Sequence, residues 1–430
     1  MQYDSWSVTN IKGDVQSLAS ETLYKMGLAL ETGEGVEQDP FQAAACYQAA
    51  ADRGHLAAAL ALGRCYEQGV GVQCSWKRSF AIYEALARKD YAPGVNALGD
   101  AYAFCHGVRG DQEKANHLYL RAACLGSTEA MMNLAGRFRA GLGIKENDYM
   151  AFGLYTAAAQ AGSTEGMYHL GCCYLDGVGT DCDPQMAVLW LRRAAEQGVS
   201  CAMYRLGVCC AEGLGTSESM AEAEEWIRKA AKLDKRFWAL AEAIKDCEMP
   251  MSTLSHPEAV TDALQIMVDE GDPLCRRLLA VYYRLGIGVP QDGAAAEALL
   301  MQAAQDGSIP AMRALAENRQ YGFGVDKDLA LARQWYERAV ERGDATAMRL
   351  LAQWHMDGID GELDPDLAVS LYENAARLGD AEAAYCLAEH YLSGSLPCDP
   401  ETVRENALTL LAQAARLGHA DAAFRLTKMC

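Results

Sequence analysis

The chain has 430 residues, of which 51% are hydrophobic, and it carries a formal net charge of −20. This acidic balance argues against a nucleic-acid backbone or an anionic membrane as the main partner, because both attract basic surfaces. No stretch approaches about 18 consecutive apolar residues, and the N-terminus has neither the basic nor the apolar region of a secretory signal. We therefore expect an acidic cytoplasmic protein without a transmembrane helix.

One phrase recurs along almost the whole sequence with a pitch of 36 residues. It reads roughly A-x-x-L-G-x-x-Y-x-x-G-x-G-V, followed by D and then by A-x-x-x-Y-x-x-A-A-x-x-G. A fixed period of this length predicts stacked two-helix units, each of which buries its apolar face only against its neighbours. The position that closes each unit is held by Gly126, Gly162, Gly198, Gly271, Gly307, Gly343 and Gly379, and by Asp90 and Asp234 in two other units.

Each unit is predicted to contain a first helix (helix A), a glycine loop and a second helix (helix B). In one unit, Gly171 lies on the apolar face of helix A, where its missing side chain lets helix B approach closely. Gly177 and Gly179 are expected to end helix A, because glycine tolerates the left-handed backbone that often follows a helix. Asp183 and Pro184 favour the start of helix B, since aspartate caps free N–H groups and proline suits the first helical turn.

In chain order, residues 1–19 precede the first unit and are predicted to form an N-terminal arm. Residues 20–235 hold six units, and residues 273–419 hold four more. Between them, residues 236–272 keep the length of a unit but lose its glycine loop, so we interpret them as a degenerate unit that divides the array. Residues 420–430 are predicted to form a C-terminal capping helix.

The degenerate unit reads CEMPMSTLSHPEA where the other units have their glycine loop. Pro250 and Pro257 make a continuous helix through this segment unfavourable. The spacing of apolar residues from Glu258 to Glu270 still predicts a helix B.

This pattern closely resembles the Sel-one-like repeat family, a relative of the tetratricopeptide repeat. The G-x-G-V loop distinguishes it from the shorter turn of a standard tetratricopeptide unit. The resemblance implies an all-α protein: an α/α solenoid, wound as a right-handed superhelix, of about eleven two-helix repeats plus a capping helix. The residues that carry the resemblance include Leu62-Gly63, Tyr66, Gly69-Val70-Gly71-Val72, and the pairs Ala122-Ala123, Ala158-Ala159, Ala194-Ala195, Ala230-Ala231 and Ala375-Ala376.

The sixteen cysteines contain no C-x-x-C spacing and mostly replace Ala, Val or Tyr of other units. We therefore expect reduced thiols that pack as small hydrophobes. Cys65 and Cys74 repeat the spacing of Cys173 and Cys182, which leaves helix-to-loop disulfides open. The alternative of thiol chemistry, or less readily of metal binding, rests on a cluster formed by Cys172, Cys173, Cys182, Cys201, Cys209 and Cys210.

Other chemistry has little support in the sequence. No G-x-S-x-G, P-loop or H-E-x-x-H motif is present, so we expect no catalytic residue and no cofactor. The loop at residues 356–366 holds five carboxylates, but their spacing differs from that of an EF-hand. A solvated loop that also caps helix B is the favoured interpretation there, and we expect no metal site.

The resemblance also identifies one residue per unit that should point into the concave groove. In tetratricopeptide relatives this position, which we call the helix-A slot, lies two residues before the Leu of Leu-Gly. Three consecutive units carry Arg there, the best side chain for bidentate capture of a carboxylate or phosphate. The slot residues are Tyr24, Leu60, Asn96, Met132, Tyr168, Tyr204, Leu240, Arg277, Arg313, Arg349 and Tyr385, and all except Leu240 are candidate binding residues.

An alternative is that these arginines pair within the chain. Arg313 has Glu317 at i+4, a spacing that favours an ion pair on a helix. Arg277 and Arg349 have Val281 and Gln353 at that spacing, so pairing along one helix does not explain all three.

These observations predict a non-enzymatic scaffold or adaptor that binds a peptide or helix of another protein along the concave face. The first half of the slot series offers apolar and aromatic contacts. The arginines would bind an acidic segment, a C-terminal carboxylate or a phosphorylated residue. The alternative is a cysteine-based redox sensor or thiol enzyme, which would need an exposed thiol of lowered pKa.

Overall fold

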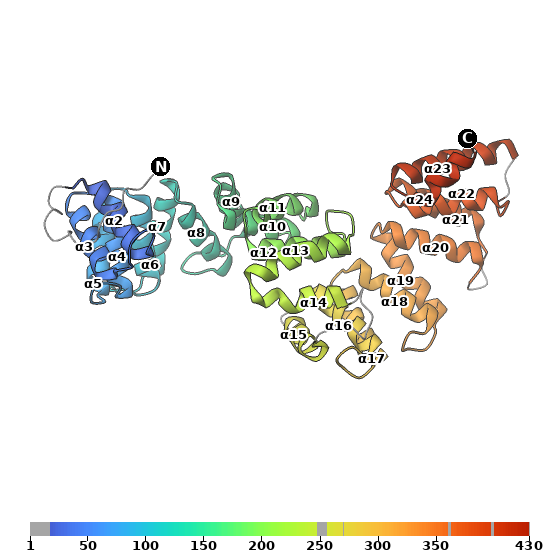
Figure 1. Ribbon diagram of the computed structural model, residues 1–430, viewed down its shortest axis with the longest axis horizontal. Coiled ribbons are helices and arrows are strands. Elements are labelled where there is room, and N and C mark those ends of the chain that lie inside the picture. The colour runs from blue at the N-terminus through green and yellow to red at the C-terminus, as the bar shows by residue number, and fades with distance from the viewer. Residues whose placement is uncertain (1–17, 247–255, 270, 360–362, 397–399, 430) are drawn as a thin grey trace. The chain divides into compact units, whose positions relative to one another are not determined.

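The computed structural model describes residues 18–246, 256–269, 271–359, 363–396 and 400–429. Over these ranges the chain forms 23 α-helices and one short 3-10 helix, with consecutive helices packed in pairs (Figure 1). This confirms the predicted all-α repeat fold. None of the helices in the described ranges is both long and apolar enough to cross a bilayer. The expected N-terminal arm lies almost entirely outside the described residues.

The chain divides into two compact units, Met1–Leu206 and Gly207–Cys430, which meet inside helix α12. The stretch 236–272 therefore lies within the second unit. The helices of the first unit are α2 (Ser20–Thr32), α3 (Pro40–Asp52), α4 (Leu56–Gln68), α5 (Trp76–Arg88), α6 (Ala92–Ala103), α7 (Gln112–Cys124), α8 (Thr128–Ala140), α9 (Asp148–Gln160), α10 (Thr164–Asp176), α11 (Pro184–Glu196) and the first part of α12 (Ser200–Glu212).

The second unit continues the alternation of helix A and helix B. Its helices after α12 are α13 (Met220–Leu233), the 3-10 helix η2 (Lys235–Phe237), α14 (Trp238–Asp246), α15 (Pro257–Asp269), α16 (Pro273–Leu285), α17 (Gly293–Gln305), α18 (Ile309–Tyr321), α19 (Leu329–Glu341), α20 (Ala345–Asp357), α21 (Pro365–Arg377), α22 (Ala381–Leu392), α23 (Pro400–Arg416) and α24 (Ala420–Met429).

The glycine of the Leu-Gly pair makes room for a large helix-B side chain. A Cβ on Gly63 would lie 2.4 Å from the Tyr83 ring, and one on Gly171 would lie 2.7 Å from Leu191. The buried tyrosines also fix the register of the pair, because their hydroxyl groups donate hydrogen bonds to helix A. Tyr83 donates to Glu67 at 2.8 Å, and Tyr372 donates to Gln353 at 2.7 Å. Close packing and a side-chain hydrogen bond thus join the helices of one pair.

The loops between helix A and helix B follow the predicted capping chemistry. Gly177 ends α10 with a φ of 66°, in the left-handed region. Asp183 caps α11 by accepting a hydrogen bond from the Met186 N–H at 2.9 Å, and Pro184 is the first residue of that helix. The helices α2, α4, α8, α10, α16, α18 and α20 all end at a left-handed glycine, so their loops begin in the same way.

The stretch 236–272 departs from this regularity. Its helix α14 is preceded by the 3-10 helix η2, Lys235–Phe237, and is described up to Asp246, where the described range stops. Helix α15 begins at Pro257 and ends at Asp269, close to the predicted helix B. The predicted irregular loop with Pro250 lies outside the described residues.

Candidate functional site

The ten candidate slot residues occupy equivalent turns of successive A helices, but they differ in exposure. Leu60 and Asn96 are only 7% and 1% exposed, so their side chains take part in packing within the first unit. Leu240, the slot residue of α14, is also fully buried. The remaining slot residues are half-buried: Tyr24, Met132, Tyr168, Tyr204, Arg277, Arg313, Arg349 and Tyr385.

At the two ends of the slot series, a tyrosine stacks on the histidine that caps the next A helix. The Tyr24 and His55 ring centroids are 4.7 Å apart, and those of Tyr385 and His419 are 4.4 Å apart. In the middle of the first unit, burial is the main cause that raises the pKa of Tyr168 to about 12. These slot residues therefore present aromatic surface rather than charge.

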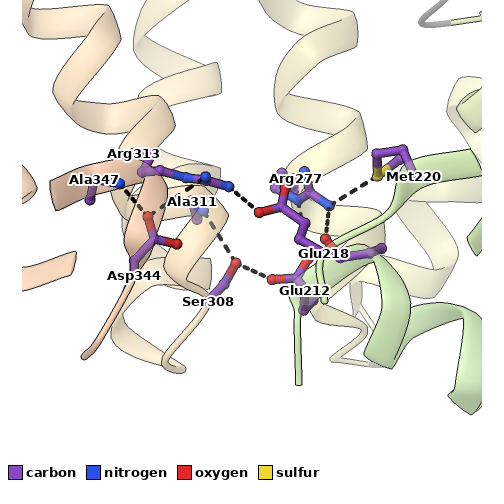
Figure 2. Close-up of polar contacts among 10 residues, drawn as sticks. Glu212, Glu218, Met220, Arg277, Ser308, Ala311, Arg313, Asp344 and Ala347 are labelled. Carbon is purple, nitrogen blue, oxygen red and sulfur yellow. Dashed lines mark hydrogen bonds and ion pairs between the residues drawn. The ribbon is translucent and has the colours of Figure 1, made fainter. Parts of the chain in front are cut away.

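In the second unit, Arg277 of α16 is held by the end of α12. Its Nε donates to Glu212 Oε1 at 3.1 Å, and its Nη2 donates to the Ala211 carbonyl at 3.1 Å (Figure 2). The Glu212 side chain is only 3% exposed and also accepts a hydrogen bond from the Ser308 hydroxyl. Glu212 and Arg277 are 65 residues apart in sequence. Two buried charges thus join α12, α16 and the start of α18.

Arg313 of α18 contacts two carboxylates from different segments. It pairs with Glu218, in the loop between α12 and α13, and its Nη1 lies 3.7 Å from Asp344 Oδ1 (Figure 2). Asp344 caps α20 by accepting from the Ala347 N–H. Burial raises the pKa of the Asp344 carboxyl, and the charge of Arg313 opposes this shift.

Arg349 of α20 repeats the same contact one unit later. Its Nε donates to Asp380 Oδ2 at 3.1 Å, and Asp380 caps α22. The three slot arginines therefore all have carboxylate partners within the chain. These partners lie on other segments, rather than at the i+4 position that Glu317 holds relative to Arg313. The structure therefore shows the arginines paired within the chain, as in the alternative interpretation of the sequence. Their partners differ from the i+4 residue considered there.

A cavity of about 370 Å³ lies beside these ion pairs, between α16 and α18. We call it the arginine pocket. Its charged lining consists of three arginines and two glutamates, and its apolar lining comes mainly from α16, α17 and α18. These residues are Arg277, Arg284, Arg313, Glu218 and Glu317, with Ala280, Val281, Leu300, Pro310 and Ala314 as the apolar part.

Arg284 was missed by the sequence analysis, because that analysis considered one slot per unit. It lies seven residues after Arg277, two helical turns further on the same face of α16. Its Nη1 lies 3.4 Å from the Asn318 side-chain oxygen, and among the described residues no carboxylate pairs with it. Arg284 therefore brings a positive charge to the arginine pocket that no described carboxylate neutralises.

Glu218 was also missed, although comparison of the loops could have indicated it. It holds the position just before the residue that caps helix B, which we call the loop slot. In four other units the loop-slot side chain donates to a helix-A carbonyl seven residues earlier. The pairs are Gln38 with Glu31, Cys74 with Glu67, Cys182 with Leu175, and Gln291 with Arg284.

An ionised glutamate cannot donate such a hydrogen bond, because its side chain has only acceptors. At the same spacing of seven residues, a donor at position 218 would bond to the Ala211 carbonyl. Arg277 Nη2 donates to this carbonyl instead. The Glu218 side chain is therefore free of the usual loop contact and pairs with Arg313.

None of the cysteines in the described ranges forms a disulfide. Cys74 and Cys182 hold the loop slot and donate to backbone carbonyls, so the helix-to-loop disulfides considered for them are not formed. Burial raises the pKa of Cys65 and Cys173 to about 11, which disfavours the reactive thiolate. Cys247, Cys398 and Cys430 lie outside the described residues. These findings do not favour the redox or thiol-enzyme alternative.

Metal binding has no candidate in the described ranges. No group of three or more His, Cys, Asp or Glu side chains is placed there so that it could hold an ion. The carboxylate-rich loop at residues 356–366 lies partly outside the described residues, since 360–362 are not included.

Known proteins resemble the chain along most of its length. The Sel1 repeat matches residues 20–55, 56–74, 92–127, 128–163, 164–199, 202–235, 273–308, 309–344, 345–380 and 381–419. No curated protein matches the chain.

Solved structures with this type of repeat are also similar. A protective antigen of uropathogenic Escherichia coli strains is 25% identical, with a TM-score of 0.46, over 95% of this chain and 79% of that one. A Sel1 repeat protein from Oxalobacter formigenes is 30% identical, with a TM-score of 0.47, over 50% of this chain and 88% of that one. An immunity protein from Pseudomonas aeruginosa is 20% identical, with a TM-score of 0.35, over 52% and 81%. The chain belongs to the Sel1 repeat family, as its sequence pattern predicts.

Proposed function

We propose that the protein is a non-enzymatic scaffold whose arginine pocket binds a carboxylate-bearing segment of a partner protein. Repeats of this family are mostly non-catalytic and typically mediate protein interactions. The observation that carries the proposal is Arg284, a pocket arginine without a carboxylate partner among the described residues. A guanidinium in a partly enclosed cavity favours an anionic ligand, because a carboxylate can accept charge-assisted hydrogen bonds from its N–H groups.

The charge of the pocket favours a single carboxylate over a phosphate. Three arginines and two glutamates line it, so the formal charge of the lining is 3 − 2 = +1, and Glu212 and Asp344 add negative charge next to Arg277 and Arg313. A carboxylate would neutralise this charge, whereas a phosphate group carries about −1.5 to −2 and would also meet the two glutamates. The carboxylate could belong to an Asp or Glu side chain or to a chain terminus.

The apolar lining defines a second feature of the ligand. Val281, Leu300 and Pro310 form part of the pocket wall. The pocket volume lies at the lower end of the range of about 300–1,000 Å³ that is usual for ligand sites. We therefore expect one apolar side chain of the partner to bind next to its carboxylate.

The half-buried tyrosine and methionine slot residues of the first unit would supply additional contacts to a protein partner. Tyr24, Met132, Tyr168 and Tyr204 belong to residue types that are enriched in interface cores. In this proposal the scaffold works in the cytoplasm, without cofactor or metal, and its partner is a protein rather than a nucleic acid or a membrane.

A selection from a random peptide library tests the proposal. Twelve-residue peptides displayed on phage would be selected on the wild-type protein and then on Arg284→Gln. We expect acidic peptides with a neighbouring apolar residue to be enriched on the wild type and lost on the variant. Arg377→Gln is the matched control, because Arg377 is exposed on α21 and lies outside the pocket. Equal enrichment on wild type and Arg284→Gln would overturn the proposal.

A further inference from the structure

We propose that Glu218 is an internal latch that occupies Arg313 in place of the partner's carboxylate and is displaced when the partner binds. We call the Glu218–Arg313 ion pair the latch. The inference rests on the proposed function, since it concerns the regulation of the same pocket. It predicts that Glu218 of the free protein competes with the partner's carboxylate for Arg313.

Glu218 does not make the loop contact that the loop-slot residues of four other units make. Loop-slot residues in four other units donate to a helix-A carbonyl, as Gln291 does to the Arg284 carbonyl at 2.9 Å. In this loop, Arg277 satisfies the corresponding carbonyl of Ala211. The loop is thus closed without Glu218, whose release would leave no backbone group of that contact unsatisfied.

Another unit also carries Glu in the loop slot. Glu146 holds this position between α8 and α9, and it is exposed. Among the described residues it has no ion pair or hydrogen bond. A glutamate in the loop slot therefore does not need an arginine partner in order for the loop to form. The contact between Glu218 and Arg313 is a specific addition in the second unit.

The two glutamates that contact the pocket arginines differ in how far they are buried. The Glu212 side chain is 3% exposed and has both Arg277 and Ser308 as partners. The Glu218 side chain is 33% exposed and pairs with Arg313, whose own side chain is 11% exposed. Releasing Glu212 would leave a charge buried, whereas Glu218 can turn into solvent. Glu212 therefore anchors the loop, and Glu218 is able to exchange.

The geometry also explains why ligand and latch exclude each other. Glu218, Arg284 and Arg313 line the same cavity. The latch joins residues 95 positions apart in sequence (Figure 2). A carboxylate that contacts both Arg284 and Arg313 would lie beside the Glu218 carboxylate. Repulsion between two negative charges in a partly buried site favours the departure of the more exposed one. The loop at residues 213–219 would then move away from α18.

The test measures binding of a fluorescein-labelled peptide selected on the wild-type protein from the random library. Glu218→Gln keeps the size of the side chain but removes the competing charge. We expect it to bind the peptide about fivefold more tightly, which corresponds to the loss of a competing ion pair of about 1 kcal/mol. Glu146→Gln makes the same change in the loop slot of the first unit and should leave the affinity unchanged.

Hydrogen exchange gives a second readout that does not depend on affinity. The Leu214 and Ser219 amides bond to the Cys209 and Cys210 carbonyls and report on the loop. We expect the peptide to accelerate their exchange in the wild type. In the free protein, Glu218→Met should produce the same acceleration, because Met can neither pair with Arg313 nor donate to the Ala211 carbonyl as Gln38 and Gln291 do in their loops, and Glu146→Met should not.

The outcomes separate the latch from the proposed function. If Glu218→Gln and wild type bind the peptide equally, while Arg284→Gln still abolishes binding, the latch is overturned and the pocket remains the binding site. If Arg284→Gln binds as well as wild type, the proposed function fails. Unchanged loop exchange in free Glu218→Met would also overturn the latch, whatever the peptide does.

Discussion

The first and second units place different side chains at the same turn of helix A, and this changes how each stabilises its buried carboxylates. In the second unit, Arg313 lies next to Asp344 and opposes the effect of burial on the pKa of that carboxyl. In the first unit, Asp100 is surrounded by Asn96, Asn133 and Tyr119, none of which carries a positive charge. Burial raises the pKa of Asp100 to about 6, although the Tyr119 hydroxyl opposes the shift.

The comparison shows that one repeat scaffold can neutralise a buried carboxyl group in two ways. The first unit favours a proton on the carboxyl, and the second supplies a guanidinium. Only the second way leaves cationic groups that a partner's carboxylate can share. This is why we place the proposed binding site in the second unit, even though the slot residues of both units share one position in the repeat.

The largest expected effect comes from breaking the buried ion pair of the second unit. Arg277→Met would leave Glu212 buried without its guanidinium, so we expect a loss of about 3–5 kcal/mol in the free energy of unfolding. Urea denaturation followed by circular dichroism would measure it. The control Arg377→Met removes an exposed i,i+4 pair with Glu373 and should cost about 0.5 kcal/mol or less. A loss below about 1 kcal/mol for Arg277→Met would contradict the role of Glu212 as an anchor.

The next effect is a pH dependence that belongs to the first unit. Because the folded-state pKa of Asp100 is raised from 3.8 to about 6, the folded protein holds a proton between these values that the unfolded chain has lost. Stability is therefore expected to fall as the pH rises from about 4 to 6, by on the order of 2–3 kcal/mol.

Asp100→Asn removes the titrating group, so its stability should not show this fall between about pH 4 and 6. The variant should be more stable than wild type near pH 7. Urea denaturation at several pH values would show the difference. An identical pH profile for wild type and variant would show that Asp100 does not titrate in this range. Asp344→Asn provides the comparison in the second unit, where Arg313 favours the ionised carboxylate.

The smallest effect should be the same in both units. Gln38 in the first unit and Gln291 in the second donate to helix-A carbonyls at 2.8 and 2.9 Å. Replacing either by Leu removes one exposed hydrogen bond, so each change should cost about 0.5–1 kcal/mol. Thermal denaturation would compare them. Clearly different costs would mean that the loop contacts are not equivalent and would weaken the argument that Glu218 departs from a common pattern.

The repeat pattern was sufficient to predict the helices, because each unit is determined by contacts within about 40 residues of sequence. Gly171 and Asp183 reveal a close helix contact and a helix start from the residue type alone. The pattern also placed Arg277 and Arg313 on one face of their helices. It could not give their partners, since Glu212 and Glu218 lie 65 and 95 residues away.

Those distant pairings pass over residues 236–272, the stretch that departs from the repeat. Helix α14 lies between α12 and α16 in sequence, yet the end of α12 contacts α16 directly through Glu212 and Arg277. A periodic pattern predicts the contacts between helices that follow one another in the chain. It contains no information on a contact between helices that are separated by a whole unit. Arg284 could have been found, because it lies on the same face of α16 as Arg277.

The central claim is that the arginine pocket binds a partner's carboxylate, and the affinity of Arg284→Gln for a selected acidic peptide tests it most directly. Fluorescence anisotropy would compare wild type, Arg284→Gln and Arg377→Gln with the same labelled peptide. We expect a loss of about 10- to 100-fold for Arg284→Gln, as for one hydrogen bond to a charged group, and no change for Arg377→Gln. Equal affinities for wild type and Arg284→Gln would contradict the claim.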